Sequence, residues 1–420
     1  MFAGRLTSGG TRTYPDLIGL LRAKAPGLEP LSIPIFRSLW TGHSLAQLAN
    51  YTRMMVLAWL TLQVTDSQVW VGLVNGLPAL ALAFFSLWGG VMSDRSSPRA
   101  ILLRARLTMA LGAMVTAFLA SVGVLQVWHI LSLSFMIGGI AGMDMISFRV
   151  MMGKAVTKDR LLSASALSNL SMNLANILGP SVGGILLAYS GPAVALWIVA
   201  GVYVLALLTV QKLPKESVAT KNTAPPVQDL VEGLRYTCRT PHVRWIIILG
   251  TAAVLAASFF PLVPGHVRDT LELGPEGLGF LMGAFGAGGL TGAMILMTQH
   301  DPRHKGLILV LMSLVWAAGV LGLGVSHNLY FSAGCLFVIG VALSIWVSNL
   351  NTLLQTTVET AMQGRVFSLN KIMMQMPMAW LLGGLLAEVL GFRGTLVIGV
   401  GVFVALHLVA YCRTQELRRN

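Results

Sequence analysis

Long apolar runs separated by short charged loops constrain this chain of 420 residues more than any other feature. The clearest example is GGVMSDRSSPRAILLRAR at 89–106, which carries five charges although only 11% of the chain is charged. Apolar runs at 68–88 and 100–124 flank it. Because a hydrocarbon layer needs about 20 apolar residues per helix, we predict a short cytoplasmic loop between two membrane spans.

The composition agrees with a membrane protein. Residues are 55% hydrophobic, whereas a soluble domain is about a quarter charged and less apolar. The apolar segments are long and continuous, unlike the alternating strands of roughly ten residues in a β-barrel. The predicted fold class is therefore an all-α polytopic membrane protein.

About twelve spans are predicted, in two six-helix halves at 38–210 and 245–412. A basic segment precedes them at 1–37, and a short tail follows at 413–420. A hydrophilic linker at 211–244 joins the halves and contains a predicted amphipathic surface helix at 227–237. The spans are expected at 39–64, 70–88, 101–124, 127–151, 161–189, 193–210, 245–263, 277–297, 307–325, 329–350, 368–390 and 395–411.

The basic residues indicate the orientation. With the N-terminus inside, the loops rich in Lys and Arg all fall on the cytoplasmic side, whereas the outer loops hold only Arg268 and Arg393. We predict a multi-pass protein of the inner, cytoplasmic membrane with both termini in the cytoplasm. The net charge of +13 is thereby explained without nucleic acid, which we exclude as a partner because no binding motif accompanies it.

Two sequence motifs resemble those of the major facilitator superfamily. GVMSDRSSPR at 90–99 resembles its motif A, G-x-L-a-D-r-x-G-r-r, with Ser97 in place of the usual Gly and Pro98 in place of a basic residue. GPSVGG at 179–184 resembles the end of its motif C, with Ala175 as the upstream small residue. Further segments at 166–184, 232–244 and 354–369, together with Arg149, resemble the enterobactin-exporter and macrolide-efflux branch.

The resemblance implies alternating access between two halves, with the substrate site between them near the midplane. It assigns gating to the motif A residues, although a plain positive-inside loop would also be basic. It places Arg149 and Arg365 at the inner gate. The glycines and proline of the motif C segment would let helices bend and approach closely. The residues concerned are Gly90, Asp94, Arg95 and Arg99 for motif A, and Gly179, Pro180, Gly183 and Gly184 for motif C.

The first span carries a polar face of His43, Gln47, Asn50 and Arg53, spaced by three or four residues. Such a face should line a protein-buried or water-filled cavity. In the implied fold the first and fourth spans line the same cavity, so we hypothesise that Arg53 pairs with Asp144. Asp144 would then titrate during transport, and the alternative is a static structural salt bridge.

Other polar residues in the spans are candidate hydrogen-bonding groups of the cavity, although the same residue types also join helices inside membranes. They are Gln47, Asn50, Asn173, Asn349, Asn351 and Gln375. The 21 methionines suit adaptable packing better than a copper site, so no metal and no cofactor is predicted.

We predict a transporter and not an enzyme, since no Walker A, HExxH or GxSxG motif occurs. The predicted activity is proton-coupled efflux of an amphipathic small molecule, siderophore or drug-like, by a monomer. Its partners are then the substrate, protons and the lipid bilayer. The alternatives are a lysophospholipid flippase or a solute importer on the same fold, and a non-transporting membrane assembly protein.

Overall fold

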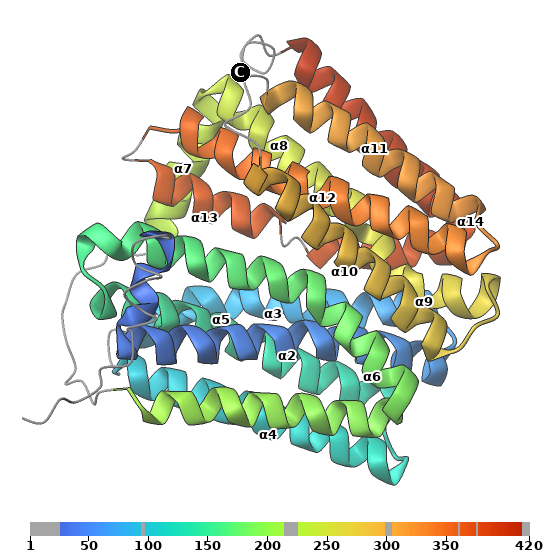
Figure 1. The fold of residues 1–420 in the computed structure, drawn as a ribbon, viewed down its shortest axis with the longest axis horizontal. Helices are drawn as coiled ribbons and strands as arrows, with labels where there is room; N and C mark the ends of the chain where they lie inside the picture. Colours follow the sequence, from blue (N-terminus) through green and yellow to red (C-terminus); the bar gives the residue numbers. More distant parts are fainter. Residues whose placement is uncertain are drawn as a thin grey trace, which may run out of the picture.

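The computed structural model describes residues 26–93, 97–213, 226–298, 305–359, 362–374 and 377–413, and these form a bundle of helices (Figure 1). The first half comprises η1 (Pro26–Ser32), α2 (Pro34–Thr65), α3 (Gln68–Ser93), α4 (Pro98–Val122), α5 (Val127–Ala155), η2 (Lys158–Arg160) and α6 (Leu161–Gln211). The linker helix is α7 (Pro226–Arg239). The second half comprises α8 (Pro241–Ala256), η3 (Ala257–Leu262), α9 (Val263–Gly265), η4 (His266–Thr270), α10 (Pro275–Thr298), α11 (Lys305–Val325), α12 (Leu329–Thr357), α13 (Gln363–Met374) and α14 (Pro377–Arg413).

Two of these helices each cross the bundle twice. At 1.5 Å per residue the 51 residues of α6 would extend about 77 Å, far beyond a hydrocarbon layer of about 30 Å. The chain turns back at Gly191 in α6 and at Gly391 in α14, whose φ angles of 74° and 70° suit glycine. With these two turns the bundle has twelve crossings, six in each half, which confirms the predicted fold class.

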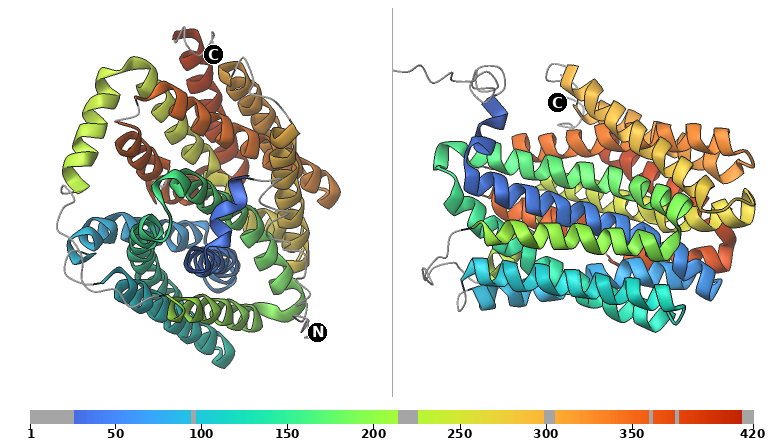
Figure 2. Two further views of the ribbon diagram at one scale, coloured as in Figure 1. Left: turned by 60° about the vertical axis from the view of Figure 1, so that its left-hand side comes forward. Right: turned by 60° about the horizontal axis from the view of Figure 1, so that its bottom comes forward.

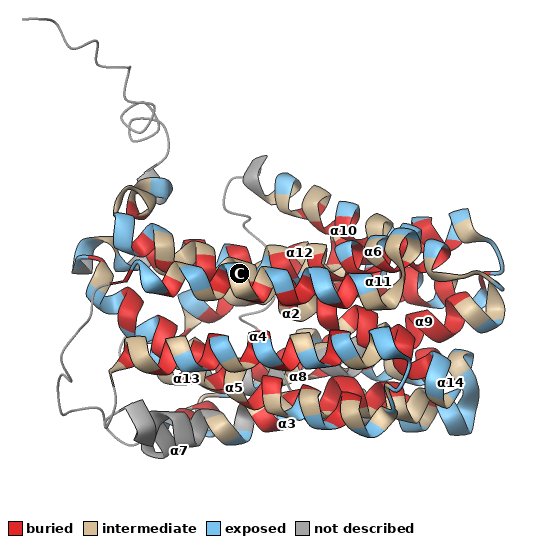
Figure 3. Cartoon of the chain, turned by 90° about the horizontal axis from the view of Figure 1, so that it is seen from below, coloured by how far each residue is buried: buried red, intermediate tan, exposed pale blue. Residues whose placement is uncertain are grey.

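The outer face of the bundle is apolar. In the described chain, seven helices are long and apolar enough to cross a membrane. On α4 a row of large apolar side chains is 44–58% exposed: Leu107, Leu111, Val115, Phe118 and Val122. Figure 3 shows such exposed positions alternating with buried ones along the outer helices. A continuous exposed apolar stripe of this kind marks contact with lipid.

The start of α4 explains why motif A departs from its family pattern. Ser97 is the N-cap of the helix, and its hydroxyl accepts a hydrogen bond from the Ala100 amide (3.3 Å). Pro98 follows as the first helical residue, a position that proline favours because its missing N–H costs nothing there. The two substitutions therefore start the third crossing three residues earlier than the apolar pattern suggested.

The two halves approach each other most closely near one end of the bundle, which we name the distal end. It is the end where α2 turns into α3 at Asp66 and Ser67, on the right in Figure 1. Figure 2 shows the helices of both halves running roughly parallel to one another, side by side across the bundle. The main inter-half pairs are α6 with α10 and α3 with α14.

Glycines permit this approach. A Cβ added at Gly184 would lie 2.6 Å from the Gly279 Cα atom, and one at Gly72 would lie 3.3 Å from the Gly384 Cα atom. Only helices without side chains at these positions can touch backbone to backbone. The motif C segment thus has two faces, because Gly179 and Gly183 pack on α2 while Gly184 packs on the other half.

The opposite end, which we name the proximal end, carries the linker helix. The predicted amphipathic helix is present as α7, which packs against α13 and α8. Glu232 of α7 forms an ion pair with Arg365 of α13, in which the Glu232 Oε2 and Arg365 Nη1 atoms are 2.9 Å apart. Arg365, one of the two predicted inner-gate residues, is therefore tied to the linker helix.

Candidate functional site: a buried charge cluster in the first half

Asp144 is the acidic centre of a cluster buried between four helices of the first half. Its carboxylate Oδ1 lies 3.0 Å from the Arg106 Nε atom of α4, and its Oδ2 lies 3.7 Å from the His43 Nδ1 atom of α2. Arg106 is fully buried, and Asp144 is 4% exposed. A carboxylate buried in a membrane span needs such compensation, because the cost of an isolated charge there is several kcal/mol.

Arg106 joins a third and a fourth helix to Asp144. Its Nη1 atom donates to the Ala206 carbonyl (2.9 Å) and to the Thr209 hydroxyl (3.0 Å) of α6. Gly42 of α2 makes room for this contact, since an added Cβ would lie 2.2 Å from the Arg106 Nη1 atom. One guanidinium therefore ties α4, α5 and α6 together against α2.

His43 is held in a defined orientation. Its ring stacks on that of Phe148, with centroids 3.9 Å apart and planes at 12°. Phe148 lies one turn after Asp144 on α5, so the same helix supplies both the carboxylate and the ring under the imidazole. An imidazole placed so close to a carboxylate can share or exchange a proton with it.

The predicted pair between Arg53 and Asp144 is wrong. Arg53 donates instead to the Ser134 hydroxyl (3.1 Å) and to the Asn50 side-chain carbonyl (3.4 Å), while Asp144 pairs with Arg106. The reason is distance along the helix. Asp144 lies beside His43, and Arg53 comes ten residues after His43, which is about 15 Å along α2. Arg53 and Asp144 therefore lie at different depths in the bundle.

Sequence reasoning missed Arg106 because it was counted with Arg104 among the charges of the stretch 89–106, although both lie inside the span predicted at 101–124. In the structure α4 begins at Pro98, so both arginines are helical. Arg104 is exposed and Arg106 is buried. The available signal was helical spacing, since Arg106 shares a face with the small residues Ala110 and Ala113.

The motif A residues are only partly within the described chain. Asp94 and Arg95 lie outside it, as does Gln375 of the cavity set. Gly90 belongs to α3, and Arg99 lies half-buried in the first turn of α4. Arg149, the other predicted inner-gate residue, is exposed, with its Nη2 atom 4.0 Å from the Met145 sulfur.

The remaining cavity candidates differ in how far they are buried. Gln47, Asn50 and Asn351 are half-buried, and Asn173 is exposed. Asn349 is buried and donates to the Ile345 carbonyl of its own helix (3.1 Å).

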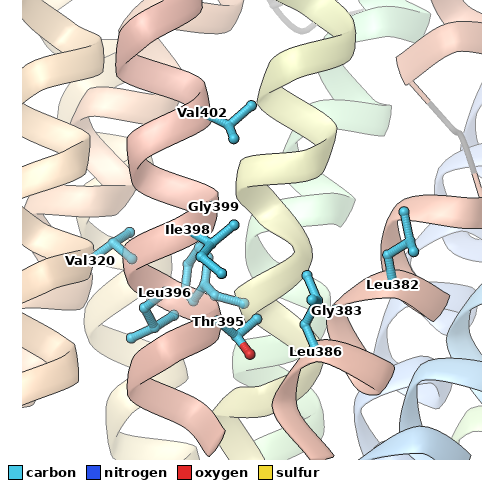
Figure 4. A pocket seen from close by; sticks show the side chains of 10 residues that line it. Val320, Leu382, Gly383, Leu386, Thr395, Leu396, Ile398, Gly399 and Val402 are labelled. Carbon is cyan, nitrogen blue, oxygen red and sulfur yellow. The ribbon is translucent and has the colours of Figure 1, made fainter. Parts of the chain in front are cut away.

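A separate apolar hollow of about 110 Å³ lies in the second half, between η3, α11 and the two crossings of α14 (Figure 4). Aliphatic side chains line it, and Leu382, Ile398 and Val402 at its edge are exposed on the outer surface. Its polar side chain, Thr395, donates to the Gly391 carbonyl (3.0 Å). Without polar groups to orient a solute, it resembles a lipid-facing groove more than a transport site.

Comparison with known sequences places these features in a family context. Residues 25–419 match the family described as transmembrane secretion effector. The enterobactin exporter EntS of Shigella boydii serotype 18 is 28% identical over 364 residues, covering 82% of this chain and 85% of that protein. EntS of Escherichia coli O139:H28 is 27% identical over the same length and the same shares of both chains.

Solved structures show the same fold at low sequence identity. A variant of the nucleoside transporter NupG has a TM-score of 0.68 at 11% identity, covering 90% of this chain and 99% of its own. A bacterial homologue of the human lysosomal transporter Spinster, in an inward-facing and unoccupied conformation, has a TM-score of 0.66 at 11% identity. It covers 92% of this chain and 99% of its own.

Proposed function

This chain belongs to the transmembrane secretion effector family of the major facilitator superfamily, and from that premise we propose that it is a proton-driven exporter of an amphipathic small organic molecule. It is a transporter and not an enzyme. The proposed direction and cargo class follow the enterobactin exporters that it resembles over 82% of its length. Efflux of a siderophore or drug-like molecule is the reading that fits these relatives.

The observation that carries the proposal is the buried cluster of Asp144, Arg106 and His43. A proton taken up by Asp144 would cancel its charge and leave the Arg106 guanidinium without its acidic partner in a dry environment. Because uncompensated buried charge is costly, the four helices that Arg106 joins would then favour a different packing. A change of protonation is thereby converted into a shift between two conformations.

The closed distal end fits one step of such a cycle. With the termini on the cytoplasmic side, closure at the distal end corresponds to the state that loads substrate from the cytoplasm. The opposite state would break the distal contacts and close the proximal end. There the motif A loop and Arg149 would hold the halves together, as the family resemblance implies.

The test is proton movement in proteoliposomes that contain only this protein, with siderophores, macrolides and lysolipids as substrates. We expect substrate-dependent proton flux in the wild type and its loss in Asp144→Asn, which keeps the shape of the side chain but cannot ionise. Asp159→Asn is the matched control, since Asp159 is exposed and lies outside the spans.

Full proton-coupled transport by the Asp144→Asn variant would remove Asp144 from the mechanism. Substrate movement without any proton flux in the wild type would instead identify a facilitator or flippase.

A further inference from the structure

A second set of buried polar groups lies on the distal side of the Asp144 cluster, inside the same four helices. Arg53 of α2 is 1% exposed, and its two hydrogen-bond acceptors, Ser134 and Asn50, are both neutral. Its Nε atom is buried without a hydrogen-bond partner among the described residues. A guanidinium in a membrane span with only neutral partners calls for a counter-charge nearby.

Tyr203 of α6 lies near enough to both this guanidinium and Asp144 to interact electrostatically with each. It is fully buried, one turn before Ala206, the residue whose carbonyl accepts from Arg106. The Arg53 guanidinium and the Asp144 carboxylate both act electrostatically on its hydroxyl. That hydroxyl forms no hydrogen bond of good geometry with any described residue.

The helix registers support this placement. Tyr203 belongs to the same buried cluster as Ala46 and Ala49 of α2, which lie between His43 and Arg53 in the chain, and Ile137 of α5, which lies between Ser134 and Asp144. The tyrosine is therefore at an intermediate depth on both neighbouring helices. A hydroxyl can accept a hydrogen bond from a guanidinium and donate one to a carboxylate at the same time.

We propose that Tyr203 is a positioning residue that links Arg53 to Asp144, so that one carboxylate serves both buried guanidinium groups of the first half. This inference rests on the proposed proton coupling through Asp144. The charged and titratable groups around the link are Arg53 and His43 of α2, Arg106 of α4 and Asp144 of α5.

The link extends the effect of one proton over a longer distance. When Asp144 is protonated, Arg106 loses its partner directly and Arg53 loses its indirect one through Tyr203. The change then reaches about 15 Å along α2, toward the distal end where the halves meet. The positive charge of Arg53 also favours the ionised carboxylate, because opposite charges stabilise each other.

The test compares the pH profile of substrate-driven proton flux in the wild type, Tyr203→Phe and Tyr189→Phe. Tyr203→Phe removes only the hydroxyl, and we expect the midpoint of the profile to rise by about one pH unit, a tenfold change in proton affinity. Tyr189, on the same helix and 90% exposed, is the matched control and should leave the midpoint unchanged.

Arg53→Gln tests the same link from its other end and should raise the midpoint in the same direction, including where Tyr203→Phe is too unstable to purify. In the double variant the two shifts should not add, because both remove one interaction. A midpoint unchanged in Tyr203→Phe, or additive shifts in the double variant, would overturn this inference alone. A wild type that couples no protons would remove the proposed function and this inference together.

Discussion

Through Asp144 and its partners, four helices of the first half are joined at one buried point. The Asp144 carboxylate contacts Arg106 and lies beside His43, and Arg106 in turn binds two groups of α6. The contact with Thr209 is partly buried and the others are buried, so each is stronger and harder to replace than its counterpart at a surface. A change of charge at this residue must therefore be answered by movement of its neighbours.

A second titratable residue, His266, lies at the distal end where the seventh crossing has ended. It is 2% exposed, and its ring stacks on Phe392 with centroids 4.7 Å apart. Burial, together with the nearby His327 and Arg393, lowers the pKa of His266 from 6.5 to about 4. His266 is thus neutral in the folded protein at neutral pH.

The pH dependence of stability should reveal this residue. In the unfolded chain His266 binds a proton below a pH of about 6.5, whereas the folded chain binds it only near pH 4. The contribution of neutral His266 to the free energy of unfolding should therefore be fully present above pH 6.5 and be lost as the pH drops toward 4. His266→Phe keeps a ring against Phe392. We expect the unfolding temperature of this variant to depend less on pH between 4 and 6.5 than that of the wild type.

His129→Gln is the control for this experiment, because it removes a histidine at the distal start of α5 in the other half. An unchanged pH dependence in His266→Phe would contradict the assignment.

At the scale of elements, helix α6 packs against helices of both halves. Its first crossing presents Gly179 and Gly183 to α2 and Gly184 to α10. The Ser181 hydroxyl adds a hydrogen bond across the same contact, to the Met282 carbonyl of α10 (2.5 Å). Motif C therefore forms the inter-half contact as well as packing within the first half.

Gly184→Ala should disturb this contact measurably. The added Cβ would lie 2.6 Å from the Gly279 Cα atom, and a backbone atom cannot move aside as a flexible side chain can. Overpacking of this kind costs about 1–3 kcal/mol, which should appear as a lower unfolding temperature in detergent. Gly201→Ala, on the same helix with nothing within 4 Å of its added Cβ, should not lower it, and equal losses in both would argue against a specific contact.

At the scale of the whole molecule, the two halves also meet at the distal end through polar contacts of Arg268, which we name the polar latch. Arg268 of the second half pairs with Asp66 (2.5 Å) and donates to the Leu62 carbonyl (3.1 Å) at the end of α2. Hydrogen bonds that Arg268 donates to the carboxylates of Asp269 and Asp66 raise the pKa of Arg268, so this cation persists at any physiological pH. Ser67 and Glu388 add a further link between the halves (3.2 Å).

Arg268→Gln should shift the molecule toward the state open at the distal end. The Asp66 side chain is largely exposed, so the pair contributes about 0.5–1 kcal/mol, equivalent to a two- to fivefold change in population. A cysteine introduced at Gln68 should then react faster with a membrane-impermeant maleimide added from the distal side. Arg393→Gln, which removes a distal arginine within the second half, is the control, and equal labelling in all backgrounds would exclude a latch.

The fold class could be predicted from sequence because its signals are local. The length of each apolar run, the polar linker and the basic loops follow from a membrane's thickness and from its exclusion of unpaired charge. The two-half arrangement and the linker helix came from the same patterns. The structure added the turns at Gly191 and Gly391 and the early start of α4 at its Ser97 cap.

The charge pairs were decided by tertiary structure alone. Polar positions on single helices could be found by their spacing, as His43 and Arg53 were, and Asp144 was recognised as a carboxylate inside an apolar span. Which carboxylate meets which guanidinium depends on the depth and rotation of four packed helices, and Arg106 and Asp144 are 38 residues apart in the chain. Since a shift of ten residues along α2 places Arg53 about 15 Å from His43, only the packed bundle could show that Asp144 pairs with Arg106.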